Sequence, residues 1–459
     1  MITAYLPLFI GSLSLISGSL SASLAHSHWV PILIFLVTYF FIAVESSRGS
    51  HLDRTAAAFC GAVAMVLARV VPLPQAYLAI NWDTLIFLLG MMILVAHFQV
   101  AGFFDWAAVS VSRVARTRFQ LLALLVFTSG ILAAFFVNDT ICLVFTPIVL
   151  AVTQRLKVPP VPYLLAVALS ANVGSAMSVT GNPQNALVGV SAHISFLGFL
   201  AHLAPVSLIG LGLIIAILAT FYAKEILRHP IRAEAGAREK TEVPQAGAVQ
   251  QEKTGSLEVK IDRVLLTKCA LAALLVIVLW ALGYSFPLVA ISVGAFILVI
   301  GRVRAQNIYK RLDWELLLFF ASLFVIIRGF EASGAVDYLI AEFHRGLEGH
   351  FLTQLFATSG VMLALANLVS NVPAVLLFRP LVASFPNSHF MWLAVASTST
   401  LAGNATPISS VANLIVLQQA GKEVSISFWE FARVGVVITI ATTLVAIGVL
   451  ALEHHFLGG

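Results

Sequence analysis

Charged residues and cysteines are both scarce in this 459-residue chain. Asp, Glu, Lys and Arg make up 10% of it, whereas 60% of the residues are hydrophobic. A soluble domain of this size does not need so much apolar surface, so the composition excludes one and predicts an integral membrane protein. The three cysteines lie in apolar segments without the spacing of a metal site or a disulfide framework.

Several functional signatures are also missing. The sequence has no nucleotide-binding loop, no set of metal-ligand residues and no catalytic triad, so we predict neither an enzyme nor a bound metal or cofactor. The alternating pattern of a membrane barrel is absent, whereas hydrophobic runs of about 18 or more residues recur along the chain. We therefore expect an all-α polytopic protein whose surroundings are a lipid bilayer, and no nucleic-acid partner.

The hydrophobic runs predict spans before and after a charged linker at 224–263. The linker is rich in Ala, Glu, Lys and Gln, and we expect it to be flexible. The first run has no basic segment before it, which argues against a cleaved signal peptide. The predicted spans are 4–25, 29–46, 55–71, 84–101, 161–192, 203–223, 264–282, 286–301, 315–330, 390–419 and 431–452.

Two of these spans are interrupted by polar residues, glycine and proline. The interruptions are 171–185 and 397–413, one on each side of the linker. Non-helical backbone survives at membrane depth only where protein buries it or where it lines a wet cavity. A pair of such breaks in matching halves of a chain is typical of a transporter binding site.

Two further apolar segments, 119–154 and 351–386, carry polar residues at their centres. Asn138-Asp139-Thr140 interrupts the first, and Ser370-Asn371-Val372-Pro373 interrupts the second. Because the arms are short and the tips polar, we predict re-entrant hairpins that enter and leave the membrane on one side. Amphipathic stretches of the interfacial type precede the hairpins, at 103–118 and 335–347.

The two halves of the chain align with each other at a shift of about 232 positions. We therefore predict an N-terminal span in 1–28, a first repeat in 29–223, the cytoplasmic linker at 224–263 and a second repeat in 264–459. Each repeat contains five spans, a hairpin and a broken helix, and the odd number of spans makes the repeats inverted. Trp82, Asp83, Phe87, Gly102 and Asp105 align with Trp314, Glu315, Phe319, Gly334 and Asp337.

The basic residues predict which side faces the cytoplasm. With the hairpins counted as non-crossing, 22 of the 26 lysines and arginines fall on the side of the linker. Such a bias marks the cytoplasmic side, so we expect a multi-pass protein of the plasma (inner) membrane with its N-terminus inside and its C-terminus outside. The remaining four are Arg69, Arg328, Arg345 and Arg379.

The polar elements are followed by residues that start helices. Four helix N-termini near mid-membrane would offer unpaired N–H donors and partial positive charge to an anion or a neutral oxyacid. The alternative is that these residues only cap helices. The expected caps are Asn138 or Asp139, Asn371, Asn182 before Pro183, and Thr406 before Pro407. The predicted binding residues are Asn138, Asp139, Thr140, Asn172, Ser175, Thr180, Gly181, Asn182, Asn185, Ser370, Asn371, Thr400, Asn404, Thr406, Ser409 and Asn413.

Asp139 is the only carboxylate that we place deep in the membrane. A carboxylate at such a depth marks an ion path or a proton relay by default, so Asp139 is the candidate proton carrier. Its alternative role is an ordinary cap at a solvated hairpin tip. The predicted centre contains no Lys, Arg or His, which argues against a di- or tricarboxylate as substrate.

Three further motifs are Phe103-Phe104-Asp105-Trp106-Ala107-Ala108, Asn138-Asp139 with Thr146-Pro147-Ile148, and Thr406-Pro407-Ile408 through Ser410, Ala412 and Leu414. They resemble motifs of the ion transporter superfamily, in its arsenite/antimonite permease and citrate-transporter-like branch. The resemblance runs from about residue 30 to residue 452. It implies opposed hairpins in two inverted repeats, an elevator-like motion and a homodimer.

The first break departs from the arsenite permease pattern, and the hairpin tips depart from the pattern of the dicarboxylate carriers. Gly181-Asn182-Pro183-Gln184-Asn185 is more similar to general anion permeases and to Na+/H+ antiporters. The dicarboxylate carriers of the superfamily have Ser-Asn-Thr at both tips, whereas this chain has Asn138-Asp139-Thr140 and Ser370-Asn371-Val372. The second departure weakens a sodium–dicarboxylate assignment.

The sequence therefore predicts a secondary active transporter of a small anion or oxyacid. The favoured activity is efflux of arsenite or antimonite in exchange for protons. The alternatives are a sodium-coupled permease for carboxylates or inorganic anions, and a Na+/H+ antiporter. From another class of protein, the rival is a passive ion channel.

Overall fold

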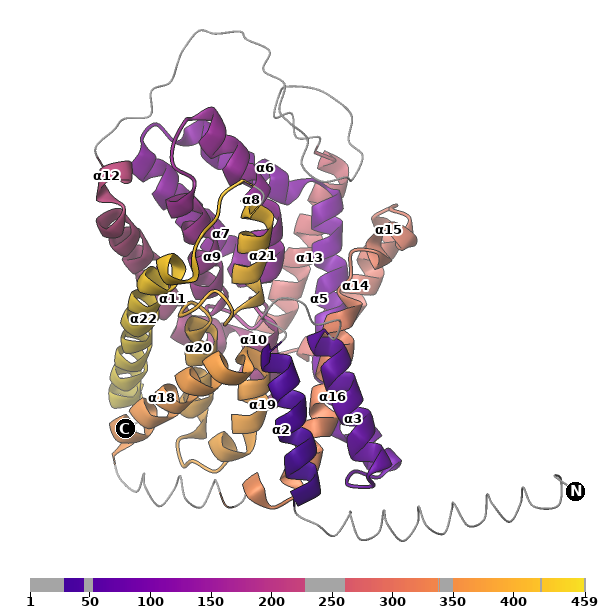
Figure 1. Cartoon of the computed structure of the whole chain (residues 1–459). Coiled ribbons are helices and arrows are strands. Elements are labelled where there is room, and N and C mark those ends of the chain that lie inside the picture. Colours follow the sequence, from indigo (N-terminus) through magenta and orange to yellow (C-terminus); the bar gives the residue numbers. More distant parts are fainter. Residues whose placement is uncertain are drawn as a thin grey trace, which may run out of the picture. The chain divides into compact units, whose positions relative to one another are not determined.

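The computed structural model describes residues 29–44, 53–227, 261–336, 338, 350–421 and 423–457. The predicted span 4–25, most of the linker at 224–263 and most of the amphipathic stretch at 335–347 lie outside these residues. Within them every regular element is a helix. Figure 1 shows these helices along the chain.

The helices follow the predicted hydrophobic runs closely, because long apolar segments satisfy their backbone groups internally only as helices. In the first half they are α2 (Trp29–Val44), α3 (Arg54–Leu67), α4 (Leu73–Ala79), α5 (Trp82–Val100), α6 (Phe103–Val114), α7 (Arg118–Phe136), α8 (Asn138–Arg155), α9 (Val161–Ser175), α10 (Pro183–Ser191), α11 (Phe196–Phe221) and α12 (Ala223–Ile226). In the second half they are α13 (Arg263–Ala281), α14 (Phe286–Ile300), α15 (Ala305–Tyr309), α16 (Trp314–Glu331), α18 (Phe351–Val369), α19 (Asn371–Ala383), α20 (Ser388–Ala402), α21 (Val411–Ala420) and α22 (Phe428–Leu457).

Six helices in the described part of the chain are long and apolar enough to cross a membrane. Together with several shorter apolar helices, they make this a multi-pass membrane protein. The sequence did not predict the short connecting helices α4 and α15, because neither carries an extended apolar run. The six helices are α5, α7, α11, α13, α18 and α22.

The hairpin segments form helix pairs that meet at the predicted polar residues. The arms α7 and α18 each contain 19 residues. A helix of that length spans about 29 Å, close to the thickness of the hydrocarbon core. The expectation that these arms are short is therefore wrong, and re-entrance remains a prediction that depends on the polar tips.

The chain contains two compact units, and each unit contains residues from both predicted repeats. The first comprises Met1–Leu85, Asp313–His350 and Leu376–Phe385. In it Phe35 of α2 stacks on Phe330 of α16, with ring centroids 4.2 Å apart. The predicted repeats, 29–223 and 264–459, are defined by internal sequence similarity and not by contacts. They remain a prediction.

The second unit comprises Ile86–Leu312, Phe351–Val375 and Pro386–Gly459. It contains both helix breaks and both hairpin tips, so every predicted binding residue belongs to this unit. Its core includes a close crossing of α7 and α9, where Gly174 lies directly against the backbone of Gly130. Small residues at helix crossings let backbones approach closely, which strengthens packing in membranes.

Gly174→Ala is expected to destabilise the protein by about 3 kcal/mol, because the new Cβ would overlap the Gly130 backbone and the helices would have to separate. The measurement is thermal unfolding in detergent. Gly212→Ala in α11 is the matched control, because a Cβ there would meet nothing within 4 Å. Equal unfolding temperatures for the two variants would contradict the close crossing.

Candidate functional site

The first break separates α9, which ends at Ser175, from α10, which begins at Pro183. Asn182 is the N-cap of α10, and its Oδ1 accepts a hydrogen bond from the Asn185 backbone N–H at 2.8 Å. Pro183 occupies the first helical position, where its missing N–H is not needed. The predicted cap and proline order is therefore confirmed in this break.

The second break separates α20, which ends at Ala402, from α21, which begins at Val411. The prediction that Thr406 and Pro407 start this helix is wrong, because the N-cap is Ser410. Residues 406–409 form a turn instead, in which the Ser409 N–H donates to the Thr406 carbonyl at 3.3 Å. The Ser409 hydroxyl also donates to the Gly403 carbonyl at 2.8 Å, which folds the chain back before α21 begins.

One asparagine closes each break in the same way. The Asn185 amide donates to the carbonyls of Ser175 and Ser178, which lie 10 and 7 residues earlier. The Asn413 amide donates to the carbonyls of Gly403 and Thr406, again 10 and 7 residues earlier. Each asparagine thus satisfies one carbonyl at the end of the preceding helix and one within the break.

Asn172 on α9 connects the tip of the first hairpin with the second break. Its Nδ2 donates to Asn404 Oδ1 at 2.9 Å and to Asn413 Oδ1 at 3.0 Å. Its Oδ1 accepts from Asn138 Nδ2 at 2.9 Å and from the Ser410 hydroxyl at 3.0 Å. Both ends of this amide are therefore fully used, and they bring together residues from α8, α9, α21 and the second break.

Thr400 on α20 makes a second connection, from that helix to the first break. Its hydroxyl accepts from Asn182 Nδ2 at 3.2 Å and from Gln184 Nε2 at 3.3 Å. The same hydroxyl lies 3.2 Å from Asn185 Oδ1, to which it donates. Ser175 joins this side of the site, because its hydroxyl accepts from Asn182 Nδ2 at 3.0 Å.

The two hairpin tips share an unusual backbone conformation. Val137, immediately before α8, has φ of 64°, and Ser370, immediately before α19, has φ of 75°. Residues other than glycine adopt positive φ at a free-energy cost of about 1–3 kcal/mol, which the surrounding structure must offset. At both tips, therefore, the second helix begins directly after a residue with positive φ.

This geometry corrects the predicted caps at the tips. The N-cap of α8 is Val137, so Asn138 and Asp139 lie in the first turn and neither is the cap. Asn138 is used differently, because its backbone N–H donates to the Gly181 carbonyl at 3.0 Å while its side chain binds Asn172. Asn371 likewise lies within α19, with Pro373 in its first turn.

Asn371 is close to the second break without the hydrogen bond that Asn138 makes. Its side-chain oxygen is buried and has no partner among the described residues. A Cβ on Gly403 would lie 3.1 Å from the Asn371 amide nitrogen, so the tip of the second hairpin reaches the end of α20. The unpaired oxygen is an available acceptor beside the break.

The remaining predicted residues lie around this network. Thr180 donates to the Ala134 carbonyl at 3.0 Å, and Gly181 accepts from Asn138. Thr406 is half-buried in the turn before α21. Asp139 and Thr140 are half-buried in the first turn of α8.

Two members of the network were missing from the predicted set. Ser410 binds Asn172, and Gln184 binds Thr400. Ser410 lies three residues before Asn413, as Asn182 lies before Asn185, so the internal alignment would have found it. Gln184 belongs to the Gly181–Asn185 motif, but nothing in the sequence pattern marked it as a binding residue.

The network is formed by neutral amides and hydroxyls. Its central residues are nearly inaccessible, with 0–2% of Asn172, Asn182, Asn185, Asn404 and Asn413 exposed. Such groups donate and accept hydrogen bonds without requiring an opposite charge. In this conformation they bind one another.

The sequence comparisons identify the family. The citrate transporter family, CitMHS, matches residues 32–400, which is most of the chain. The chain belongs to this family. It is therefore a transporter, and the matched region contains Asn138, Asn172 and Asn182 of the polar network.

Relatives match along nearly their whole length. A 46 kDa membrane protein of Mycobacterium leprae is 29% identical over 91% of this chain and 96% of its own. The silicon efflux transporter LSI3 of Oryza sativa subsp. japonica is 28% identical over 86% of this chain and 92% of its own. The transporter YdaH of Alcanivorax borkumensis has a similar fold, with a TM-score of 0.57, 14% identity, and coverage of 94% of this chain and 98% of its own.

Proposed function

We propose that this CitMHS transporter is a secondary active carrier of a small anion or oxyacid, and that it exports arsenite or antimonite in exchange for protons. The observation that carries the proposal is the buried network in which Asn172 bonds to Asn404 and Asn413, and Thr400 bonds to Asn182 of the first break. It offers several donors and acceptors within one small region. A compact solute covered by oxygen atoms and hydroxyl groups can use both kinds of group.

The absence of charge from this network favours an oxyacid over citrate. None of the side chains that bond across the two breaks is a Lys, Arg or His, so a tricarboxylate would find no cation there. An uncharged or singly charged oxyacid requires none. The silicon efflux activity in the name of LSI3 supports this class, because silicon and arsenic(III) both form small, hydroxyl-bearing oxyacids in water.

The repeat arrangement supports a carrier over a passive channel. We propose two inverted repeats whose hairpins are re-entrant and whose motion is elevator-like, with the N-terminus in the cytoplasm and a homodimer as the assembly. The identical closures by Asn185 and Asn413, and the shared positive φ of Val137 and Ser370, support the duplication. A carrier needs its site closed in some conformations, and the buried network fits that requirement.

Coupling to protons assigns the central role to Asp139. It lies next to Asn138, which binds Asn172, so a change in its charge would act directly on the network. Sodium is the alternative coupling ion, because carbonyl oxygens at the ends of α9 and α20 are suitable ligands for it. With sodium as the coupling ion, the protein would be a sodium-coupled permease for carboxylates or inorganic anions, or a Na+/H+ antiporter.

The proposal is tested by arsenite transport into inside-out membrane vesicles with an acidic lumen. Arsenite is expected to accumulate, and an uncoupler is expected to collapse the accumulation. Vesicles without the protein are the control. Absence of accumulation would contradict arsenite export, and citrate with an imposed proton or sodium gradient would then be the next substrate to measure.

A further inference from the structure

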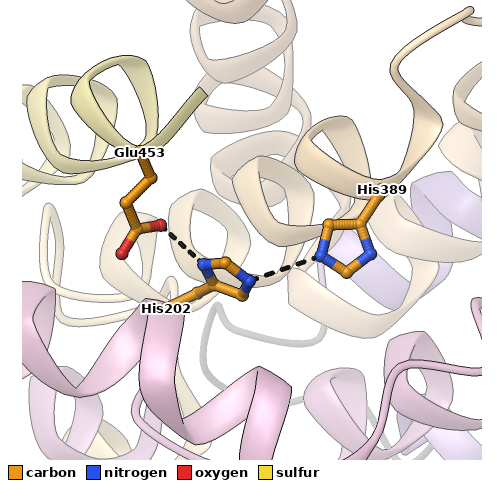
Figure 2. Close-up of polar contacts among 3 residues, drawn as sticks. All are labelled: His202, His389 and Glu453. Atoms are coloured by element: carbon orange, nitrogen blue, oxygen red, sulfur yellow. Dashed lines mark hydrogen bonds and ion pairs between the residues drawn. The ribbon is translucent and has the colours of Figure 1, made fainter. Parts of the chain in front are cut away.

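A cluster of imidazoles and one carboxylate lies outside the network described above. His202 on α11, His389 on α20 and Glu453 on α22 converge within the second compact unit, as Figure 2 shows. The transport proposal assigns no role to these three residues. His389 is exposed, so the cluster is open to solvent.

The Glu453 carboxylate fixes one side of the His202 ring. Its Oε2 lies 2.6 Å from His202 Nδ1, and the two side chains are only 21% and 17% exposed. With Nδ1 carrying the proton that this contact needs, the other ring nitrogen of a neutral His202 has a free lone pair. A carboxylate in this position orients the ring and increases the basicity of the opposite nitrogen.

That opposite nitrogen faces the second imidazole. His202 Nε2 and His389 Nε2 lie 3.5 Å apart. This separation exceeds the usual range of about 2.7–3.2 Å for a hydrogen bond from nitrogen. Two nitrogens bound to one tetrahedral zinc at about 2.0–2.1 Å would be about 3.3–3.4 Å apart. The observed spacing therefore suits two ligands of one metal ion better than it suits a direct hydrogen bond.

The surroundings hold both rings in this arrangement. Phe390 contacts both imidazoles, with ring centroids 5.9 Å from His202 and 5.6 Å from His389. His389 is the second residue of α20, and the positive end of a helix disfavours a protonated imidazole. A neutral imidazole is the form that binds metals.

We propose that His202 and His389 bind a divalent transition-metal ion such as zinc, with Glu453 as the positioning residue behind His202. The ion bridges α11 and α20, and Glu453 extends the bridge to α22. Water molecules complete the coordination, because no group of three His, Cys, Asp or Glu side chains able to hold a metal occurs among the described residues. Two protein ligands give a weaker site than the closed sites of structural zinc proteins.

The proposal is tested by zinc titration of purified protein without a histidine tag, with isothermal calorimetry as the readout. The wild type is expected to bind one zinc ion at this site. His389→Ala and His202→Ala should each lower that affinity at least tenfold, and Glu453→Gln should lower it by about 10–100-fold, as loss of an outer-shell carboxylate does. Cobalt(II) in place of zinc provides a second readout, because its absorption spectrum reports nitrogen ligation.

His455→Ala is the matched control, because it removes an imidazole close to Glu453 in sequence without touching the pair. It is expected to bind zinc as the wild type does. Thermal unfolding without metal establishes that each variant is folded, and exposed His389 is the substitution least able to disturb packing. Wild-type zinc affinity in folded His389→Ala, or no zinc binding by the wild type, would overturn the proposal.

Discussion

Asp139→Asn is expected to abolish arsenite accumulation driven by a proton gradient while leaving exchange of arsenite across the membrane partly intact. Asparagine has almost the same shape as aspartate but cannot gain or lose the proton that coupling requires. The residue lies in the first turn of α8, one position after the amide that binds Asn172. Removing its charge therefore changes the coupling and preserves the packing of the network.

The measurement compares uptake under an imposed gradient with exchange of labelled arsenite at equilibrium. Asp105→Asn is the matched control, because Asp105 also lies in the first turn of a helix, α6, but outside the network. Burial raises the pKa of the Asp105 carboxyl, and the charge of Arg311 opposes that rise. Gradient-driven uptake at the wild-type rate by Asp139→Asn would refute the assignment of Asp139 as the proton carrier.

Asn172→Ala is expected to destabilise the protein by about 3–5 kcal/mol and to remove substrate binding. The substitution leaves Asn138, Asn404, Asn413 and Ser410 each without the partner that Asn172 provides. A buried polar group without a partner costs about 1–3 kcal/mol. The four losses do not add fully, because neighbouring groups rearrange and water can enter.

The measurement is thermal unfolding of the purified protein, followed by arsenite binding at a temperature where the variant is folded. Asn387→Ala is the control, because Asn387 precedes α20 and its side chain makes no capping hydrogen bond. It should unfold at nearly the wild-type temperature. A similar result for Asn172→Ala would mean that the amide does not hold α9 to the second break.

The sequence predicts the helices and the positions of the breaks because both depend on local properties. Apolar runs of sufficient length determine the helices, and the Asn182-Pro183 pair determines the start of α10. The same reasoning fails at Thr406-Pro407, where the local pattern is nearly identical. There the hydroxyl of Ser409 binds the Gly403 carbonyl, and this contact moves the helix start to Ser410.

The sequence could not predict contacts between segments that lie far apart along the chain. Asn172 was predicted as a binding residue, but its central position depends on partners that lie 232 and 241 residues away. The hairpin caps were predicted wrongly for a related reason. Positive φ at Val137 has no signature in the sequence, since valine rarely adopts it, and only the surrounding fold maintains it.

If the buried asparagines bind the solute, as we propose, their hydrogen bonds to one another compete with it. Each solute has to displace amide–amide bonds that are already well formed, so its apparent affinity is lower than its contacts alone would provide. A solute with too few oxygen atoms leaves buried amides unpaired and is rejected strongly, as happens in enzymes that recognise polar groups. The selectivity of the proposed site would therefore depend on how many of these hydrogen bonds a solute replaces.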